Sequence, residues 1–141
     1  MTRQELVLAA LSPAQGALHT PVQVQKLLFL IETNLVNLVD DGPHFHFEPY
    51  HYGPFDRAVY DELLRLSWQG YVDIMQDRWN SYRLTVEGQR QGERLLSTLD
   101  EQARDYITTI SSFVRSLTFT QLVAAIYRAY PAMRERSVFQ G

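Results

Sequence analysis

The segment that most restricts the fold lies in the middle of the chain, where two apolar runs flank a polar stretch. Residues 71–75 and 82–85 have the composition of strands, and residues 76–81 between them are polar. Two short strands joined by a polar loop are typical of a β-hairpin. Gly70 is expected to end a helix before this hairpin, and Thr85 to cap the helix after it. A hairpin between helices is typical of the wing of a winged-helix domain.

Two helices are predicted before the hairpin segment. Thr2 and Glu5 have the spacing of a capping box, which predicts a first helix that ends near Leu11. Thr20, followed by a proline, has the pattern of an N-cap for a second helix. Apolar residues then recur every three or four positions as far as Leu38, which predicts one continuous buried stripe and the core element of the fold. Four positions of this helix are expected to remain in water: Gln23, Lys26, Thr33 and Asn37.

The stretch between the second helix and the hairpin is predicted to hold one short strand and a third helix. Residues 40–43 have strong turn chemistry and should end the second helix. Residues 44–52 alternate aromatic and polar residues and read as a strand, which Pro49 restricts to a sheet edge. The third helix is expected to begin at Gly53 and Pro54 and to end at Gly70.

The remaining residues predict further helices packed on the same body. Apolar stripes indicate helices over residues 103–117 and 119–130, and no linker-like spacer precedes either of them. Gly88 and Gly92 lie four residues apart, where another helix could approach closely. The predicted fold is therefore mainly α with a small β-hairpin. It is expected to be a single domain, 1–141, with a winged-helix-like core over residues 1–99 and a C-terminal helical extension over residues 100–141.

Composition excludes several classes of chemistry. The chain of 141 residues contains no cysteine, which excludes disulfide scaffolds, thiolate metal sites and thiol nucleophiles. The formal net charge of −3 gives no basic surplus of the kind that nucleic-acid-binding proteins usually carry. No signal-peptide pattern and no apolar run long enough for a membrane span is found, so a cytoplasmic protein with no membrane association is expected. No cofactor is expected either.

Three short stretches resemble one known family. They are Val24-Gln-Lys-Leu-Leu28, Tyr50-His-Tyr-Gly-Pro54 and Gly70-Tyr-Val. Together they are similar to the Panacea, or SocA-like antitoxin, domain and to related small bacterial proteins, with Val24 where the family tends to have leucine. The resemblance implies a compact, mainly helical body and a non-enzymatic role in neutralising a toxin or mediating protein contacts.

A metal site and its alternative are both open for residues 44–51. His44, His46 and Glu48 would share one face of a strand, with His51 near enough to join, and imidazole and carboxylate groups are ligands for zinc or iron. This set suggests a small metal-dependent hydrolase as one hypothesis. The alternative is that the intervening phenylalanines point inward and the histidines face water.

DNA binding is a second hypothesis and depends on the third helix and the hairpin. In a winged-helix protein that helix would take the recognition position, with Arg57 and Arg65 facing the major groove. The hairpin offers Arg78, Trp79 and Arg83, which supply charge and a stacking surface. Three carboxylates on the same helix oppose contact with phosphates.

Protein binding is the leading hypothesis. Aromatic residues are concentrated over residues 50–68, and such side chains bury a large area at low entropy cost. Tyr52 and Phe55 are expected to pack inside around the Gly-Pro turn, which leaves Tyr50, His51 and Tyr60 as candidates for partner contact. The sequence therefore predicts an antitoxin-like interaction module whose partner is a toxin or defence component, with a homodimer as a further possibility for the last two helices.

Overall fold

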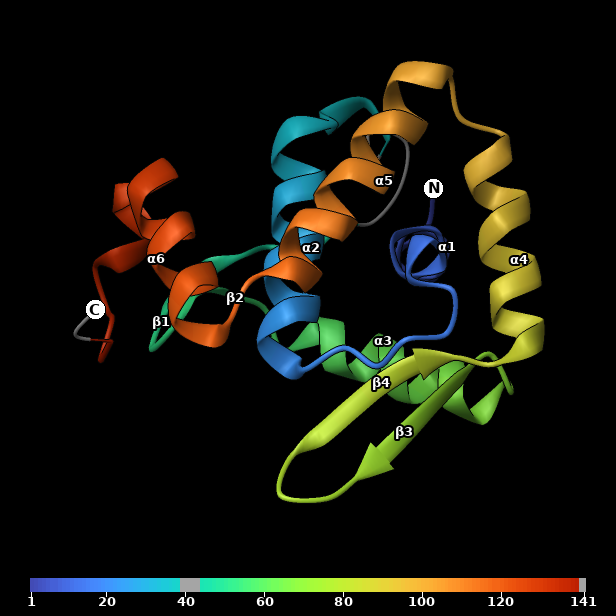
Figure 1. The fold of residues 1–141 in the computed structure, drawn as a ribbon, viewed down its shortest axis with the longest axis horizontal. Coiled ribbons are helices and arrows are strands. Elements are labelled where there is room, and N and C mark those ends of the chain that lie inside the picture. Colours follow the sequence, from blue (N-terminus) through green and yellow to red (C-terminus); the bar gives the residue numbers. More distant parts are fainter. Residues whose placement is uncertain (39–43, 140–141) are drawn as a thin grey trace.

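The computed structural model describes residues 1–38 and 44–139. Within these residues the fold is mainly helical with two small antiparallel hairpins, which confirms a mainly α class with a hairpin and adds a hairpin that was not predicted (Figure 1). The elements follow in the order α1 (Arg3–Leu11), α2 (Pro21–Asn34), β1 (Glu48–Tyr50), β2 (Gly53–Phe55), α3 (Ala58–Trp68), β3 (Val72–Gln76), β4 (Asn80–Leu84), α4 (Val86–Ser97), α5 (Glu101–Ser116) and α6 (Phe119–Ala129).

Helix α1 lies at the centre of the helical body. It packs against α2, α3, α4 and α5, and Figure 1 shows it end-on between α4 and the α2–α5 pair. Residues 6–11 are all buried, which is expected of a helix surrounded by other helices. The capping box predicted at Thr2 and Glu5 is present, with each side chain accepting a hydrogen bond from the other residue's backbone N–H.

Helix α2 contains eight consecutive buried residues, 24–31. Thr20 caps it as predicted. The helix ends at Asn34, so the prediction that it continues to Leu38 was wrong. Asn34 donates a side-chain hydrogen bond to the carbonyl oxygen of Leu30 at 2.8 Å, a local bond that competes with the helical pattern, and residues 36–38 form a separate 3-10 turn. The predicted turn over residues 40–43 lies outside the described residues.

The segment after residue 44 differs most from its prediction. Strands β1 and β2 form a hairpin in which Pro49 lies opposite Pro54, and the two residues between the strands make the turn. Gly53 has φ of +104°, which is incompatible with a right-handed helix, so the prediction of a helix start at Gly53 and Pro54 was wrong. Helix α3 begins at Ala58, whose N–H donates to Asp56 Oδ1 at 2.8 Å. Gly70 ends this helix region with φ of +85°, at the predicted place.

The second hairpin, β3–β4, is where the sequence predicts it. Val72 pairs with Leu84 at one end and Gln76 with Asn80 at the other, so three residues remain at the tip. His19, which precedes α2, forms an antiparallel bridge with Tyr82 through two backbone hydrogen bonds of 2.7 and 2.9 Å. Thr85 caps α4 as predicted. The hairpin is thereby joined to the helical body on both sides.

The last helices belong to the same hydrophobic core. Ile107 and Val114 of α5 and Leu122 and Ile126 of α6 are buried together with residues of α1 and α2. Helix α5 lies along α2, and α6 packs beside the β1–β2 hairpin at the end of the molecule that holds the C-terminus (Figure 1). Among the described helices, none is both long enough and apolar enough to cross a membrane.

Helix α4 approaches its neighbours through two glycines. A Cβ atom at Gly92 would lie 2.4 Å from the carbonyl oxygen of Leu8, and one at Gly88 would lie 1.9 Å from that of Tyr71. The predicted close approach of another helix is therefore confirmed at Gly92, where the neighbour is α1. At Gly88 the neighbour is not a helix but the backbone of Tyr71, just before β3.

Replacing Gly92 with alanine is expected to destabilise the protein. In an open helix the change would stabilise by about 1 kcal/mol through helix propensity, but here the new methyl group meets backbone that cannot move away cheaply. We expect a net loss of about 2 kcal/mol in the free energy of unfolding, measured by urea denaturation. The matched control is Glu93→Ala at the next, exposed position, and equal stabilities of the two variants would contradict the close contact.

Candidate functional site

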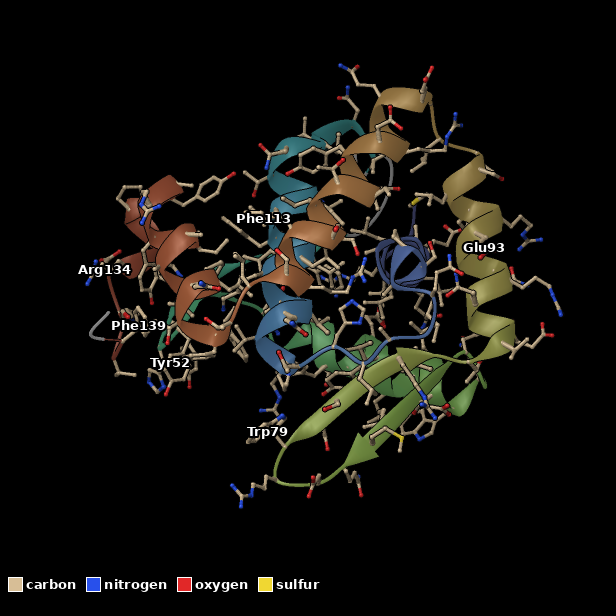
Figure 2. All side chains as sticks on the ribbon, in the orientation of Figure 1. Tyr52, Trp79, Glu93, Phe113, Arg134 and Phe139 are labelled. Atoms are coloured by element: carbon tan, nitrogen blue, oxygen red, sulfur yellow. The ribbon has the colours of Figure 1, made fainter. Side chains whose placement is uncertain are left out.

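An apolar groove with an uncharged lining lies on the surface of the described residues. It has a volume of about 470 Å³ and lies where the start of α2, the β1–β2 turn, the tip of β3–β4 and the start of α6 meet. Figure 2 shows Tyr52 and Trp79 along the same edge of the molecule. None of the lining residues carries a charge: they are Thr20, Pro21, Val22, Gln23, Tyr52, Trp79, Leu117, Phe119 and Leu122.

Three large aromatic side chains line this groove and remain exposed. Tyr52 is 42% exposed, Phe119 45% and Trp79 59%. The rings of Tyr52 and Phe119 meet edge to face with centroids 5.1 Å apart. Thr118 fixes the start of α6 through a capping box, which holds Phe119 at the rim of the groove. Aromatic side chains left in contact with water in one depression form a surface suited to burial by a partner.

The position of Tyr52 corrects a sequence prediction. Tyr52 was expected to pack inside, but it occupies the two-residue turn of the unpredicted β1–β2 hairpin. A side chain at the tip of a hairpin extends beyond the strands that would cover it. Phe55, which belongs to β2, is half-buried and stacks on Tyr50 with centroids 4.8 Å apart.

A second, smaller cavity adjoins the groove. It has a volume of about 260 Å³ and shares three of its lining residues, Pro21, Val22 and Tyr52, with the groove. The other lining residues come from α2, the β1–β2 hairpin and α3: Gln25, Lys26, Tyr50, His51, Gly53, Phe55 and Tyr60. This set contains a lysine, a histidine and no acidic residue.

Lys26 is the group that sequence reasoning missed. It was expected to lie in water, but it is only 3% exposed, and its Nζ donates to the carbonyl oxygen of Pro54 at 3.2 Å. Burial lowers the pKa of this amine from 10.5 to about 7. One signal was available: the chain contains twelve arginines and a single lysine. Of these two basic side chains, only lysine can lose its proton inside a protein, because arginine stays charged. A lone lysine in an arginine-rich chain is therefore a candidate for a buried position.

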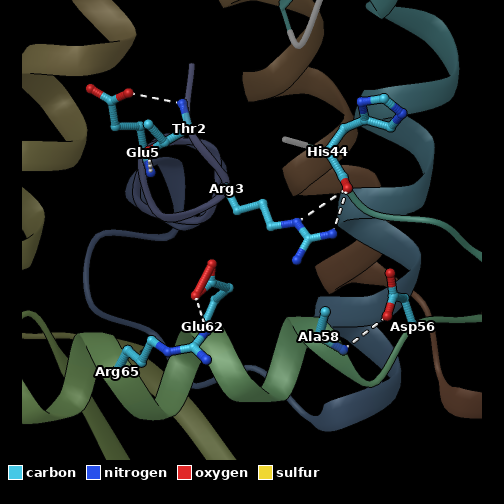
Figure 3. Close-up of polar contacts among 8 residues, drawn as sticks. All are labelled: Thr2, Arg3, Glu5, His44, Asp56, Ala58, Glu62 and Arg65. Atoms are coloured by element: carbon cyan, nitrogen blue, oxygen red, sulfur yellow. Dashed lines mark hydrogen bonds and ion pairs between the residues drawn. The ribbon is translucent and has the colours of Figure 1, made fainter. Parts of the chain in front are cut away.

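Gln25 fixes the segment that covers Lys26. Its Oε1 accepts from the N–H of Asp56 at 3.0 Å, and its Nε2 donates to the carbonyl oxygen of the same residue at 2.9 Å. Asp56 in turn accepts from the N–H groups of His46 and Ala58, the second of which is drawn in Figure 3. The β1–β2 hairpin, α2 and the start of α3 are thereby held together around one buried amide.

The predicted protein-contact residues lie around the smaller cavity. Tyr50 is exposed, and its ring stacks on that of His51 with centroids 4.2 Å apart. Tyr60 is half-buried rather than at the surface; it contacts Gln25, and burial raises its pKa to about 12. All three residues line the cavity that contains Lys26.

The predicted DNA-contact residues divide into paired and exposed arginines. Arg65 of α3 forms an ion pair with Glu62 at 2.5 Å (Figure 3), and Arg83 of β4 pairs with Asp73 at 3.4 Å. Arg57, just before α3, and Arg78, at the hairpin tip, are exposed. Trp79, the other residue predicted to contact DNA from the hairpin, lies in the apolar groove.

The candidate metal ligands do not converge within the described residues. The rings of His44 and His46 lie 4.9 Å apart, but no group of three or more histidine or acidic side chains is assembled. Phe45 is buried and both histidines are exposed, as the alternative interpretation expected. The backbone of this segment is tied to α1, because Arg3 donates two hydrogen bonds to the carbonyl oxygen of His44 (Figure 3).

Comparison of the sequence with known protein families and with curated proteins gives no match. The groove and the lysine cavity therefore have to be interpreted from their own chemistry.

The low pKa of Lys26 predicts how stability varies with pH. The unfolded chain binds a proton at Lys26 up to about pH 10.5 and the folded chain only up to about pH 7, so stability rises with pH between these values. From about pH 7 to about pH 9 we expect a gain of about 2 kcal/mol in the free energy of unfolding.

The comparison is with Lys26→Met, a variant of similar shape that cannot titrate. Urea denaturation at both pH values should show that this variant is the more stable protein at neutral pH and lacks most of the gain. A pH dependence that is the same in both proteins would mean that Lys26 keeps an ordinary pKa.

Proposed function

We propose that this protein is a non-enzymatic binding module of the bacterial cytoplasm, which acts by holding an apolar segment of a partner protein in the groove. One observation carries the proposal: Tyr52, Trp79 and Phe119 come from three separate elements, converge on one uncharged depression and stay exposed. Aromatic anchors in a pocket dominate the energetics of protein interfaces.

The chemistry of the groove defines the occupant. Its nine lining residues offer few polar partners and no counter-ion, so a charged segment would lose hydration there without compensation. Its volume of about 470 Å³ accommodates several large apolar side chains. The occupant is therefore a segment of a partner protein that carries a small cluster of leucine-like or aromatic side chains.

The resemblance of residues 22–75 to the Panacea domain supports a regulatory role for this binding. In an antitoxin-like protein the partner would be a toxin or a defence component.

The experiment uses the two tryptophans of the chain as a matched pair. Trp79 lies in the groove, whereas Trp68 is 75% exposed at the end of α3 and does not line it. Peptides are selected on the wild-type protein from a phage-displayed random library and then titrated as synthetic peptides. We expect apolar peptides that bind with affinity reduced at least about tenfold, or ~1.4 kcal/mol, by Trp79→Ala or Phe119→Ala.

Trp68→Ala is the control and should leave peptide affinity unchanged. In a Trp68→Phe background the fluorescence of Trp79 should change on peptide binding. Failure to select any peptide, or peptides that bind Trp79→Ala as well as wild type, would contradict the proposal. A dimer that dissociates in Trp79→Ala, seen by sedimentation, would instead assign the groove to a second copy of the chain.

A second candidate function, transcriptional regulation through DNA, is supported by the order of the elements. Helix α1, the bridge residue His19, helices α2 and α3 and the hairpin β3–β4 come in the order of a winged-helix domain, with the β1–β2 hairpin inserted between α2 and α3 and residues 100–141 added as a helical extension. In that arrangement α3 would be the recognition helix. Two of the five candidate residues, Arg65 and Arg83, are already paired with carboxylates, so Arg57 and Arg78 would carry most of the phosphate contact.

This alternative predicts salt-sensitive binding to duplex DNA. Binding of a fluorescent random-sequence duplex should weaken steeply as salt rises, and Arg57→Ala with Arg78→Ala should reduce the slope of log affinity against log salt by about 1 per arginine. Arg90→Ala, on α4 and paired with Glu87, is the control. If no salt-dependent binding is detected at low ionic strength, the DNA function is excluded.

A further inference from the structure

We propose that the cavity beside the groove is a carboxylate-binding site in which Lys26 pairs with an acidic side chain of the partner segment. The inference rests on the proposed function and extends it, because it specifies the partner's chemistry: a glutamate or aspartate next to the apolar residues that fill the groove. Three features of the molecule support it: the surroundings of Lys26, the lining of its cavity and the adjacency of that cavity to the groove.

Lys26 is a buried amine that has no counter-ion among the described residues. Its Nζ has three hydrogens when charged, and the described residues supply one acceptor, the carbonyl oxygen of Pro54. None of the ion pairs in the described part of the chain includes it. A buried ammonium group is costly unless it is paired, so an anion that reached Nζ would gain a strong and weakly screened interaction.

The cavity has the lining that a carboxylate requires. Aromatic side chains form much of the lining, and its titratable groups other than the tyrosines are Lys26 and His51. No acidic side chain lines it, so nothing there repels an anion. Its volume of about 260 Å³ exceeds what a carboxylate and the methylenes that carry it occupy, since one liquid water takes roughly 30 Å³.

The cavity and the groove are adjacent and share part of their lining. Pro21, Val22 and Tyr52 line both, so Tyr52 stands at the boundary between an apolar region and a cationic one. A partner segment that places apolar side chains against Trp79 and Phe119 therefore carries its neighbouring residues toward Lys26. This arrangement favours an acidic residue at that point over a neutral one.

The single lysine of the chain permits a direct test. Protein labelled with carbon-13 at the lysine ε position gives one side-chain NMR signal, which reports the protonation of Lys26. The probes are hydrocinnamate and its uncharged amide, hydrocinnamamide, which have the same shape. We expect hydrocinnamate to bind at least about tenfold more tightly than the amide below the pKa of Lys26, and to raise that pKa, because the anion binds the charged form.

Variants separate the contributing groups. Lys26→Met should abolish the preference for the acid. A preference that survives in Lys26→Met and is lost in His51→Gln would overturn the assignment to Lys26, because His51 is the other basic side chain in the lining. Comparison of acid and amide on the wild-type protein needs no variant and stands even if Lys26→Met folds poorly. Equal binding of the two probes, or no change in the Lys26 signal with the acid, would overturn the carboxylate site.

The two proposals fail in different ways. Trp79→Ala should remove peptide binding but leave the response of Lys26 to hydrocinnamate, since Trp79 does not line the cavity. If the groove binds peptides and Lys26 ignores carboxylates, the proposed function stands and the acidic anchor is wrong. If Lys26 responds and no peptide binds the groove, the cavity is a site for a free small carboxylate and the partner's acidic residue is excluded.

Discussion

The burial of an unbroken stretch of α2 imposes the condition that organises the rest of this structure. Eight consecutive residues are enclosed, and two of them, Gln25 and Lys26, are polar and must be satisfied inside the protein. Both take their partners from the backbone of one short segment, at Pro54 and Asp56. That segment therefore has to lie across α2. Its position fixes the β1–β2 turn on one side and the start of α3 on the other.

The candidate binding surface is a consequence of this anchoring. Because the turn is held against α2, Tyr52 projects where the start of α6 and the tip of the second hairpin also arrive. No single helix or strand forms the groove. It is formed only when segments that are distant in the sequence fold together. Its apolar lining and the cationic cavity next to it differ in chemistry over a short distance, which is a basis for selecting one partner segment over another.

Local signals predicted much of the fold, and contacts between distant segments account for what they missed. The caps at Thr2, Thr20 and Thr85 and the β3–β4 hairpin depend on neighbouring residues and were found from the sequence. The β1–β2 hairpin was read as one strand and a helix start, because Gly-Pro is also a common way to begin a helix. The hairpin conformation is decided by the hydrogen bonds of Gln25 and Lys26 in α2 to the backbone of residues 53–56. The groove was missed for the same reason, and only Trp79 and Tyr52 of its three aromatic residues were singled out.

The confinement of Lys26 has a bearing on how the protein can be regulated. Enzymes that acetylate, methylate or attach ubiquitin to lysine need an amine that extends from the surface, and these 141 residues offer none outside the core. The backbone amine of Met1 donates to the carbonyl oxygen of Leu38 at 2.8 Å. Modification of Lys26 would first require α2 and the β1–β2 turn to separate. Such a modification would therefore occur only on molecules that are at least locally unfolded.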